Sequence, residues 1–192
     1  MQYKDAPNPM NKAELMALKP TIHKVSLNLV DMNRDIYTSE KLTVALHPSE
    51  TVTRMMVRIL AYALNYDQDL DFTKGLSTAD EPDLWIVRPD NSVSCWIEVG
   101  QASPERMRKG VSRAEQVILY AYGSEVDIWW AKNGDGLKAL PKTEVFRFDA
   151  EQVTQLEALC DRTMELTITL SENQIFVAAG DNQVEVEVSA LS

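Results

Sequence analysis

PDLWIVRPDNSVSCWIEVGQ, residues 82–101, consists of two short apolar runs separated by turn-forming residues. Proline, aspartate and asparagine between two apolar runs predict a β-hairpin. If the chain reverses in a two-residue turn at Asp90–Asn91, Trp85 pairs with Trp96, and this register fixes every other pair in the hairpin. The hairpin is therefore the segment whose strand pairing the sequence predicts residue by residue.

The same register brings two carboxylates together on one face of the hairpin. Asp83 is opposite Glu98 and shares its face with Trp85 and Trp96, because side chains alternate between faces along a strand. The other face is wholly apolar and consists of Leu84, Ile86, Cys95, Ile97 and Val99. Directly opposed residues have Cβ atoms roughly 5 Å apart, and two like charges at that distance destabilise the pair.

A divalent cation is one way to offset this repulsion. Mg²⁺ and Mn²⁺ prefer carboxylate oxygens and keep several water ligands, which leaves positions for a phosphate group. Asp83 and Glu98 are therefore the predicted metal ligands. Two alternatives remain open: an arginine from the next helix neutralises one carboxylate, or both carboxylates are exposed to solvent at the end of the hairpin.

The next helix is the most basic segment of the chain. Ser103 and Pro104 have the chemistry of an N-cap and a first helical turn, and Arg106, Lys109 and Arg113 follow as a local basic groove for nucleic acid. The whole chain has 19 basic and 29 acidic residues, a net charge of −10, which disfavours non-specific attraction to phosphate backbones. A large nucleic-acid interface is therefore not expected.

The rest of the sequence predicts an α/β (α+β) fold in which helices flank a mixed central sheet. Alternation over residues 20–31 and 36–46 predicts a first hairpin, and apolar residues at helical spacing over 52–64 predict a helix with Ser49 as its N-cap. The tail from Met164 predicts a three-stranded meander. Between them we predict a helix over DAEQVTQLEALC and three strands: QVILYAYG, VDIWWAK and TEVFRF.

Composition indicates a cytoplasmic protein. No apolar run is long enough to span a membrane, and the N-terminus lacks the apolar stretch of a secretion signal. Cys95 and Cys160 are far apart in sequence and are predicted to be buried free thiols. Residues 1–15 are polar and contain proline, so we predict a loosely ordered extension, followed by a single domain over residues 16–192.

Several sequence blocks resemble the YaeQ family: PDLW, WIEVGQ about a dozen residues later, and HPSET and FTKGLSTADEP upstream. The resemblance runs from Met16 to roughly the last predicted strand, and these blocks, together with MMVR at 55–58, are specific rather than generic. Proteins of this family have a variant of the restriction-endonuclease-like PD-(D/E)XK nuclease fold, and their cellular role is largely uncharacterised. The resemblance therefore implies a nuclease-like fold with additional hairpins and a meander, more firmly than a function.

Position by position, the resemblance makes Pro82 and Asp83 the PD element and Glu98 the second acidic residue, and Glu50 resembles the accessory glutamate of that fold. In active nucleases of this class the carboxylates hold one or two metal ions, which lower the pKa of a water molecule and stabilise charge on phosphate. The lysine that normally assists is absent, because the residue two positions after Glu98 is Gly100.

Two replacements for the lysine are predicted. A bulge at Gly100 would bring Gln101 into the site, and Lys109 or Arg106 of the basic helix could supply a cation.

Several of these residues also have plainer interpretations. Glu50 lies one turn before Arg54 and two turns before Arg58, so an ion-pair ladder on the surface explains it as well. Trp85 and Trp96 could stack on bases or pack under a helix.

His23 and His47 lack partners for a zinc site or a nucleophile–base pair, and we predict structural roles for both.

Two functions are consistent with this sequence. In the first, the protein is a metal-dependent phosphodiesterase or nuclease: Asp83 and Glu98 hold Mg²⁺ or Mn²⁺, Glu50 supports the site, and Gln101 orients the water or the substrate. In the second, the protein is a catalytically inactive interaction module that keeps the nuclease fold. The absent lysine and the negative net charge favour the second function.

Overall fold

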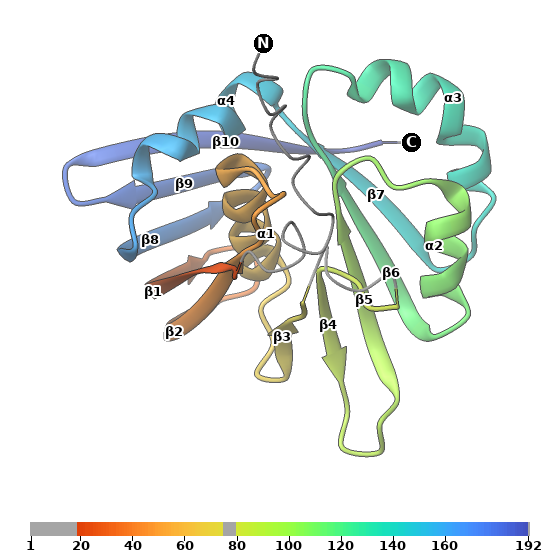
Figure 1. The fold of residues 1–192 in the computed structure, drawn as a ribbon, viewed down its shortest axis with the longest axis horizontal. Helices are drawn as coiled ribbons and strands as arrows, with labels where there is room; N and C mark the ends of the chain where they lie inside the picture. Colours follow the sequence, from red (N-terminus) through yellow and green to blue (C-terminus); the bar gives the residue numbers. More distant parts are fainter. Residues whose placement is uncertain (1–18, 75–79, 192) are drawn as a thin grey trace, which may run out of the picture.

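A mixed sheet of ten strands runs through the part of the chain that the computed structural model describes, residues 19–74 and 80–191 (Figure 1). In chain order the strands are β1 (Thr21–Asp31), β2 (Ile36–Leu46), β3 (Leu70–Phe72), β4 (Leu84–Val87), β5 (Val93–Val99), β6 (Ala114–Ala121), β7 (Thr143–Phe148), β8 (Thr163–Ser171), β9 (Gln174–Ala179) and β10 (Asn182–Ala190). Their order across the sheet is β2-β1-β8-β9-β10-β7-β6-β5-β4-β3. Strand β1 is parallel to β8, and β6 is parallel to β5 and β7, whereas the remaining neighbours in this sheet are antiparallel. The predicted mixed α+β class is confirmed.

The strand predictions near both ends of the sequence are also confirmed. β1 and β2 pair along their whole length, from Thr21 opposite Leu46 to Asp31 opposite Ile36. β8, β9 and β10 form the predicted meander. The short strand β3 lies in a segment for which no strand was predicted.

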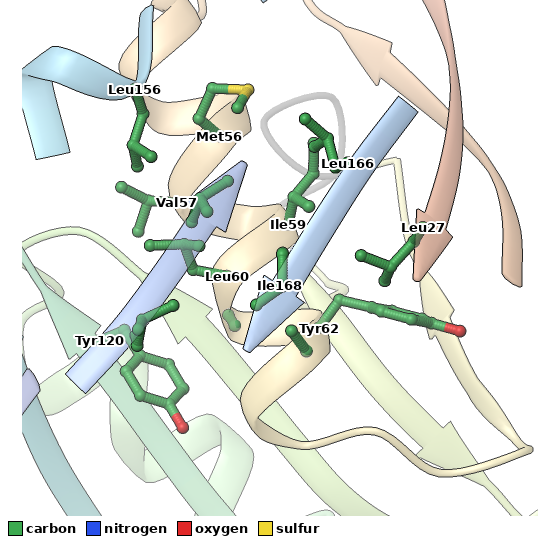
Figure 2. Packing of buried hydrophobic residues seen from close by; sticks show 14 of the residues in the cluster. Leu27, Met56, Val57, Ile59, Leu60, Tyr62, Tyr120, Leu156, Leu166 and Ile168 are labelled. Atoms are coloured by element: carbon green, nitrogen blue, oxygen red, sulfur yellow. The ribbon is translucent and has the colours of Figure 1, made fainter. Parts of the chain in front are cut away.

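The sheet curves around α1 (Val52–Leu64), which Figure 1 shows between the two arms of the sheet. Nine of its thirteen residues are buried, from Met55 to Ala63. The helix is apolar on almost every side, as a helix enclosed by a sheet must be, and Arg58 is the one charged residue in the buried run. Figure 2 shows α1 packed against residues of β1, β6, β8 and the 3₁₀ turn η3 (Leu156–Leu159): Leu27, Tyr120, Leu156, Leu166 and Ile168.

Helices α2 (Pro104–Val111) and α3 (Val126–Lys138) cover the other face of β5, β6 and β7 (Figure 1). They enclose a second apolar cluster that includes Trp96, Met107, Val117, Leu119, Trp129 and Leu137. The short helix α4 (Ala150–Gln155) and η3 pack instead on the α1 side, where Val153, Leu156 and Leu159 are buried.

The predicted strand VDIWWAK is wrong, because this run forms the first turns of α3. The buried residues Val126, Trp129 and Leu137 recur at helical spacing, whereas Ile128 between them is 68% exposed. Because Ile128 is apolar although it is exposed, the apolar residues of this segment no longer recur at helical spacing, and the run has the length of a strand. The glycines in the following NGDGLK also have low helix propensity, so the segment lacks the usual sign of a long helix.

The β4–β5 hairpin has the predicted register, although its turn differs. Trp85 is opposite Trp96, as expected. The loop is longer than a two-residue turn, because the Arg88 N–H donates to the Ser92 carbonyl oxygen at 2.9 Å and the three residues PDN lie between them. A bulge that leaves Ser94 without a paired residue compensates for the extra loop residue, so the pairs from Ile86–Cys95 to Leu84–Ile97 keep the predicted register.

Ser103 and Thr51 are the N-caps of α2 and α1. Ser103 caps α2 as expected, because its side chain accepts the N–H three residues on. The prediction of Ser49 for α1 is wrong: Thr51 is the N-cap, and the Glu50 N–H closes a turn on the His47 carbonyl oxygen at 2.8 Å before the helix begins. Glu50 therefore lies just before the helix and not on it.

Gly110 of α2 permits a close approach between this helix and the hairpin. A Cβ at position 110 would lie 2.8 Å from Cδ1 of Trp96. Gly110→Ala is therefore expected to lower the free energy of unfolding by about 1–3 kcal/mol, despite the higher helix propensity of alanine. Urea unfolding measures the effect, with Arg108→Ala on the exposed side of α2 as the control. Equal stability of Gly110→Ala and the parent would contradict this packing.

No helix in the described residues combines the length and the apolar content needed to span a membrane. The predicted extension over residues 1–15 lies outside the described residues. A single domain over residues 16–192 stays a prediction.

Candidate functional site

Asp83 and Glu98 lie at the same end of the β4–β5 hairpin and are 2% and 6% exposed. The strand pairing ends at Leu84, so the two carboxylates do not form the directly opposed pair that the register predicts. Instead the Asp83 N–H donates to the Ile97 carbonyl oxygen at 3.0 Å, and Asp83 Oδ2 accepts the Val99 N–H at 2.8 Å. These two bonds fix the Asp83 carboxylate across the end of β5.

Arg54, in the first turn of α1, holds the other oxygen of Asp83. Its Nη2 lies 2.7 Å from Asp83 Oδ1 and 3.3 Å from the Val99 carbonyl oxygen, and its Nη1 lies 2.8 Å from Glu50 Oε1. Burial by itself would lower the pKa of Arg54, but the Asp83 and Glu50 carboxylates more than offset this and raise the pKa above its ordinary value. One guanidinium group therefore joins three parts of the site.

The ion-pair ladder predicted as the alternative for Glu50 is present, but it is buried and not on the surface. Arg58 Nη1 lies 3.1 Å from both carboxylate oxygens of Glu50, and Arg58 Nε lies 3.8 Å from Asp83 Oδ1. The side chains of Glu50, Asp83 and Arg58 are each 2% exposed, and that of Arg54 is 14% exposed. Charges this deep need partners, so the ladder and Asp83 form one network, which we call the carboxylate–arginine network.

Glu98 turns to the opposite side of the sheet, toward α2. Its Oε1 accepts the Trp96 indole N–H at 2.8 Å, and Arg106 Nε lies 2.8 Å from the same oxygen. Burial raises the pKa of Glu98 to about 7; Arg106 opposes the rise, and the negative charge of Asp83 adds to it. Glu98 is therefore the carboxylate that an arginine of the basic helix neutralises, as one of the alternatives predicted. The charge of Asp83 still acts on the pKa of Glu98.

Gly100 and Gln101 follow the end of β5, beside the carboxylate–arginine network. Gly100 has a φ of +113°, which ends β5. The Gln101 side chain is exposed and its Nε2 donates to the Tyr122 carbonyl oxygen at 3.3 Å. Within the described part of the chain no hydrogen bond joins Gln101 to either predicted metal ligand, so Gln101 lies at the rim of the network.

Placing the motif lysine at position 100 is expected to be costly. Gly100→Lys should lower the free energy of unfolding by about 1–3 kcal/mol, because L-residues rarely adopt a φ of +113°. Space is not the obstacle, since a Cβ at this position meets no atom within 4 Å. Chemical denaturation measures the loss, with Gln101→Lys as the control that adds the same charge one residue away. Unchanged stability of Gly100→Lys would show that this backbone accepts a lysine.

Tyr122 belongs to the site although it was not among the predicted residues. Burial raises its pKa, and the charge of Arg54 and a hydrogen bond with the Thr51 side chain oppose the rise. β6 runs parallel to β5 with Tyr120 opposite Val99, so the residues that follow both strands meet at one edge of the sheet. This parallel pairing is the signal that would have identified Tyr122.

The residues of the predicted basic groove contact the chain itself. Arg113 lies beyond the end of α2 and not on the helix as predicted. Its Nη1 donates to the Asp80 carbonyl oxygen at 2.9 Å, and Lys109 of α2 pairs with the Asp80 carboxylate. Arg106 donates to the carbonyl oxygen of Glu81. Helix α2 therefore binds the segment that leads into β4, and a contact of this helix with nucleic acid stays a prediction.

The two tryptophans of the hairpin have different environments. Trp96 is 0% exposed beneath α2, with the Arg106 guanidinium 5.7 Å from its ring centroid, so the packing interpretation is confirmed for Trp96. Trp85 is partly exposed and lines a groove of about 540 Å³ together with Arg113 and Lys142.

The remaining candidate nucleophiles and bases occupy ordinary structural positions. Cys95 is buried on the α1 face, and burial raises its pKa to about 11. Cys160 is partly exposed, so the prediction that it is buried is wrong. His23 is buried with its Nδ1 2.8 Å from the Asp161 carbonyl oxygen, and His47 accepts a backbone N–H from two residues later.

The network can be tested for its fit to a divalent cation. Asp83 Oδ1 and the Val99 carbonyl oxygen converge on one cationic nitrogen, Nη2 of Arg54, and both oxygens are donors that hard cations prefer. Within residues 19–74 and 80–191, no group of three or more His, Cys, Asp or Glu side chains is arranged to hold a metal ion. The donors fit a cation that has few protein ligands and several waters, as Mg²⁺ usually has. In this structure the Arg54 guanidinium lies between the two oxygens.

Fold and site together define a mixed α+β protein whose curved sheet encloses one helix and carries a buried carboxylate–arginine network at the end of a hairpin. The model of the family described as YaeQ protein matches residues 16–188. The chain belongs to the YaeQ family.

Relatives and solved structures support this assignment. The chain is 37% identical over 176 residues to the uncharacterized protein YaeQ of Escherichia coli (strain K12), which covers 91% of this chain and 97% of the relative. The crystal structure of YaeQ protein from Pseudomonas syringae is 38% identical with a TM-score of 0.86, covering 90% of this chain and 96% of that one. The YaeQ protein from Xanthomonas axonopodis pv. citri is 32% identical with a TM-score of 0.85, covering 89% and 97%. The predicted family is confirmed, and the PD-(D/E)XK classification stays a prediction.

Proposed function

We propose that this chain is a metal-dependent phosphodiesterase, a nuclease of PD-(D/E)XK-like fold, in which Asp83 and Glu98 hold Mg²⁺ or Mn²⁺. The proposal rests on the convergence of Asp83 Oδ1 and the Val99 carbonyl oxygen on a single cationic nitrogen, at 2.7 and 3.3 Å. Glu98 lies at the same end of the hairpin, near enough for the charge of Asp83 to act on its carboxylate. When bound, a divalent cation supplies a water of lowered pKa and stabilises charge on a phosphate.

The other residues of the site position these groups. The Val99 N–H holds one oxygen of Asp83 and leaves the other facing the cation position. Glu50 supports the site by pairing with Arg58, whose Nε lies 3.8 Å from Asp83 Oδ1. Arg106 provides the cation beside Glu98 that the motif lysine would otherwise provide.

The proposed substrate is a nucleic acid that enters over the basic edge of the site. Arg106, Lys109 and Arg113 lie on this edge, and Gln101 at the rim orients the water or the substrate. The net charge of −10 confines the contact to this edge.

Thermal unfolding with and without millimolar Mg²⁺ and Mn²⁺ tests the proposal, because a ligand that binds the folded state raises the midpoint. We expect a rise in the parent and in the control Asp181→Ala, which removes an exposed acid in the turn before β10, but not in Asp83→Ala or Glu98→Ala. Cleavage of single- or double-stranded DNA or RNA should then be lost in Glu98→Ala. The absence of any rise in the parent would reject the metal site.

The second candidate is an interaction module that keeps this fold without catalysis. The observation that favours it is that Glu50, Asp83 and Glu98 each have an arginine partner. A protein that binds Mn²⁺ with the expected dependence on Asp83 but cleaves none of the four nucleic acids would support this module over the nuclease.

A further inference from the structure

The Arg54 guanidinium occupies the position that the proposed metal site needs. Nη2 contacts Asp83 Oδ1 and the Val99 carbonyl oxygen, and Nη1 contacts Glu50 Oε1. A divalent cation and this nitrogen cannot share those two oxygens, because both are positive and both need the same short contacts. Metal binding at Asp83 therefore requires the guanidinium to move.

Arg54 is also the member of the network that can move. Its side chain is 14% exposed, whereas Arg58 is 2% exposed and hydrogen-bonds to the Ala45 carbonyl oxygen as well as to Glu50. If Arg54 leaves, Arg58 still balances Glu50, and its Nε remains 3.8 Å from Asp83 Oδ1. Glu50 and Asp83 therefore keep Arg58 as a positively charged neighbour after Arg54 has moved away.

We propose that Arg54 is a built-in competitor for the divalent cation: its guanidinium closes the site in the metal-free protein, and metal binding displaces it from Asp83 and the Val99 carbonyl group. This inference rests on the metal site of the proposed function and adds to it the residue that sets the affinity. When the binding-competent state is a minor population, the apparent dissociation constant rises by the inverse of that fraction. Removing Arg54 should remove this penalty.

Calorimetric titration with Mn²⁺ alone tests the competition in the full-length chain. We expect Arg54→Met to bind Mn²⁺ at least tenfold more tightly than the parent, Arg54→Lys to bind with an affinity between the two, and the control Arg88→Met to match the parent. The double variant Arg54→Met/Asp83→Ala should lose the tight binding, which assigns the gain to this site.

The outcomes separate this inference from the proposed function. Mn²⁺ binding by the parent that is lost in Asp83→Ala but is no tighter in Arg54→Met would overturn the competitor role and leave the metal site standing. The absence of Mn²⁺ binding in both the parent and Arg54→Met would overturn both.

A measurement on the unmodified chain covers the case in which Arg54→Met fails to fold. Side-chain ¹⁵N NMR of arginine, assigned with Arg54→Lys, should show the Arg54 signals change during a Mg²⁺ titration while those of Arg88 do not. Saturating Mg²⁺ binding by calorimetry with unchanged Arg54 signals would overturn the inference.

Discussion

Replacing Arg58 with methionine is expected to lower the free energy of unfolding by about 3–5 kcal/mol, the usual cost of removing one partner of a buried ion pair. The Arg58 side chain is 2% exposed and its Nη1 donates to the Ala45 carbonyl oxygen and to both oxygens of Glu50. Methionine is unbranched, like the aliphatic stem of arginine, and fills apolar surroundings well, so the substitution removes the charge while the stem remains packed. Glu50 would remain buried with Arg54 as its arginine partner.

Urea unfolding of Arg58→Met, with Arg88→Met as the matched control, measures this loss. Arg88 pairs with Asp69 at 2.9 Å, but both side chains are substantially exposed, and exposed pairs contribute little. The double variant Arg58→Met/Glu50→Gln should regain part of the stability, because it no longer buries an undercompensated carboxylate. A loss for Arg58→Met no larger than that for Arg88→Met would show that the network does not stabilise the fold.

The fold was predictable where the signal is local. The alternation in β1 and β2, the apolar run of α1 and the register of Trp85 against Trp96 all follow from neighbouring residues. The α3 segment was mistaken for a strand because its exposed Ile128 continues an apolar run. Propensity and periodicity are weak guides where one exposed apolar residue changes the period.

The site was predictable only in part, because its partners come from distant segments. Arg106 follows Glu98 closely in sequence, and its role as a neutralising arginine was among the alternatives. The contact between Arg54 and Asp83 was not predicted, since it exists only because the sheet curves around α1 and brings the helix to the end of the hairpin. Glu50 was correctly linked to Arg54, but the sequence gives no indication that this pair is buried.

In the metal-free protein, the contribution of Glu98 to stability should fall by about 3 kcal/mol as the pH rises from about 4.5 to about 7. Burial raises the pKa of Glu98 from its ordinary value of 4.5 to about 7. Between these two values the folded chain holds a proton that the unfolded chain has released, so the contribution of Glu98 is fully present below pH 4.5 and is lost by pH 7.

The comparison of the parent with Glu98→Gln isolates this contribution, because other groups titrate equally in both proteins. Urea unfolding in buffer with a chelator should show the stability of the parent relative to Glu98→Gln decreasing between pH 4.5 and 7 and becoming constant above pH 7. Asp90→Asn, at an exposed acid whose pKa is lowered by the Ser92 side chain and backbone N–H, is the control. The stability of the parent relative to Asp90→Asn should not show this decrease, because both proteins keep Glu98. If the parent instead gains stability relative to Glu98→Gln over this range, the ion pair with Arg106 outweighs burial, and Glu98 is already charged when the metal is absent.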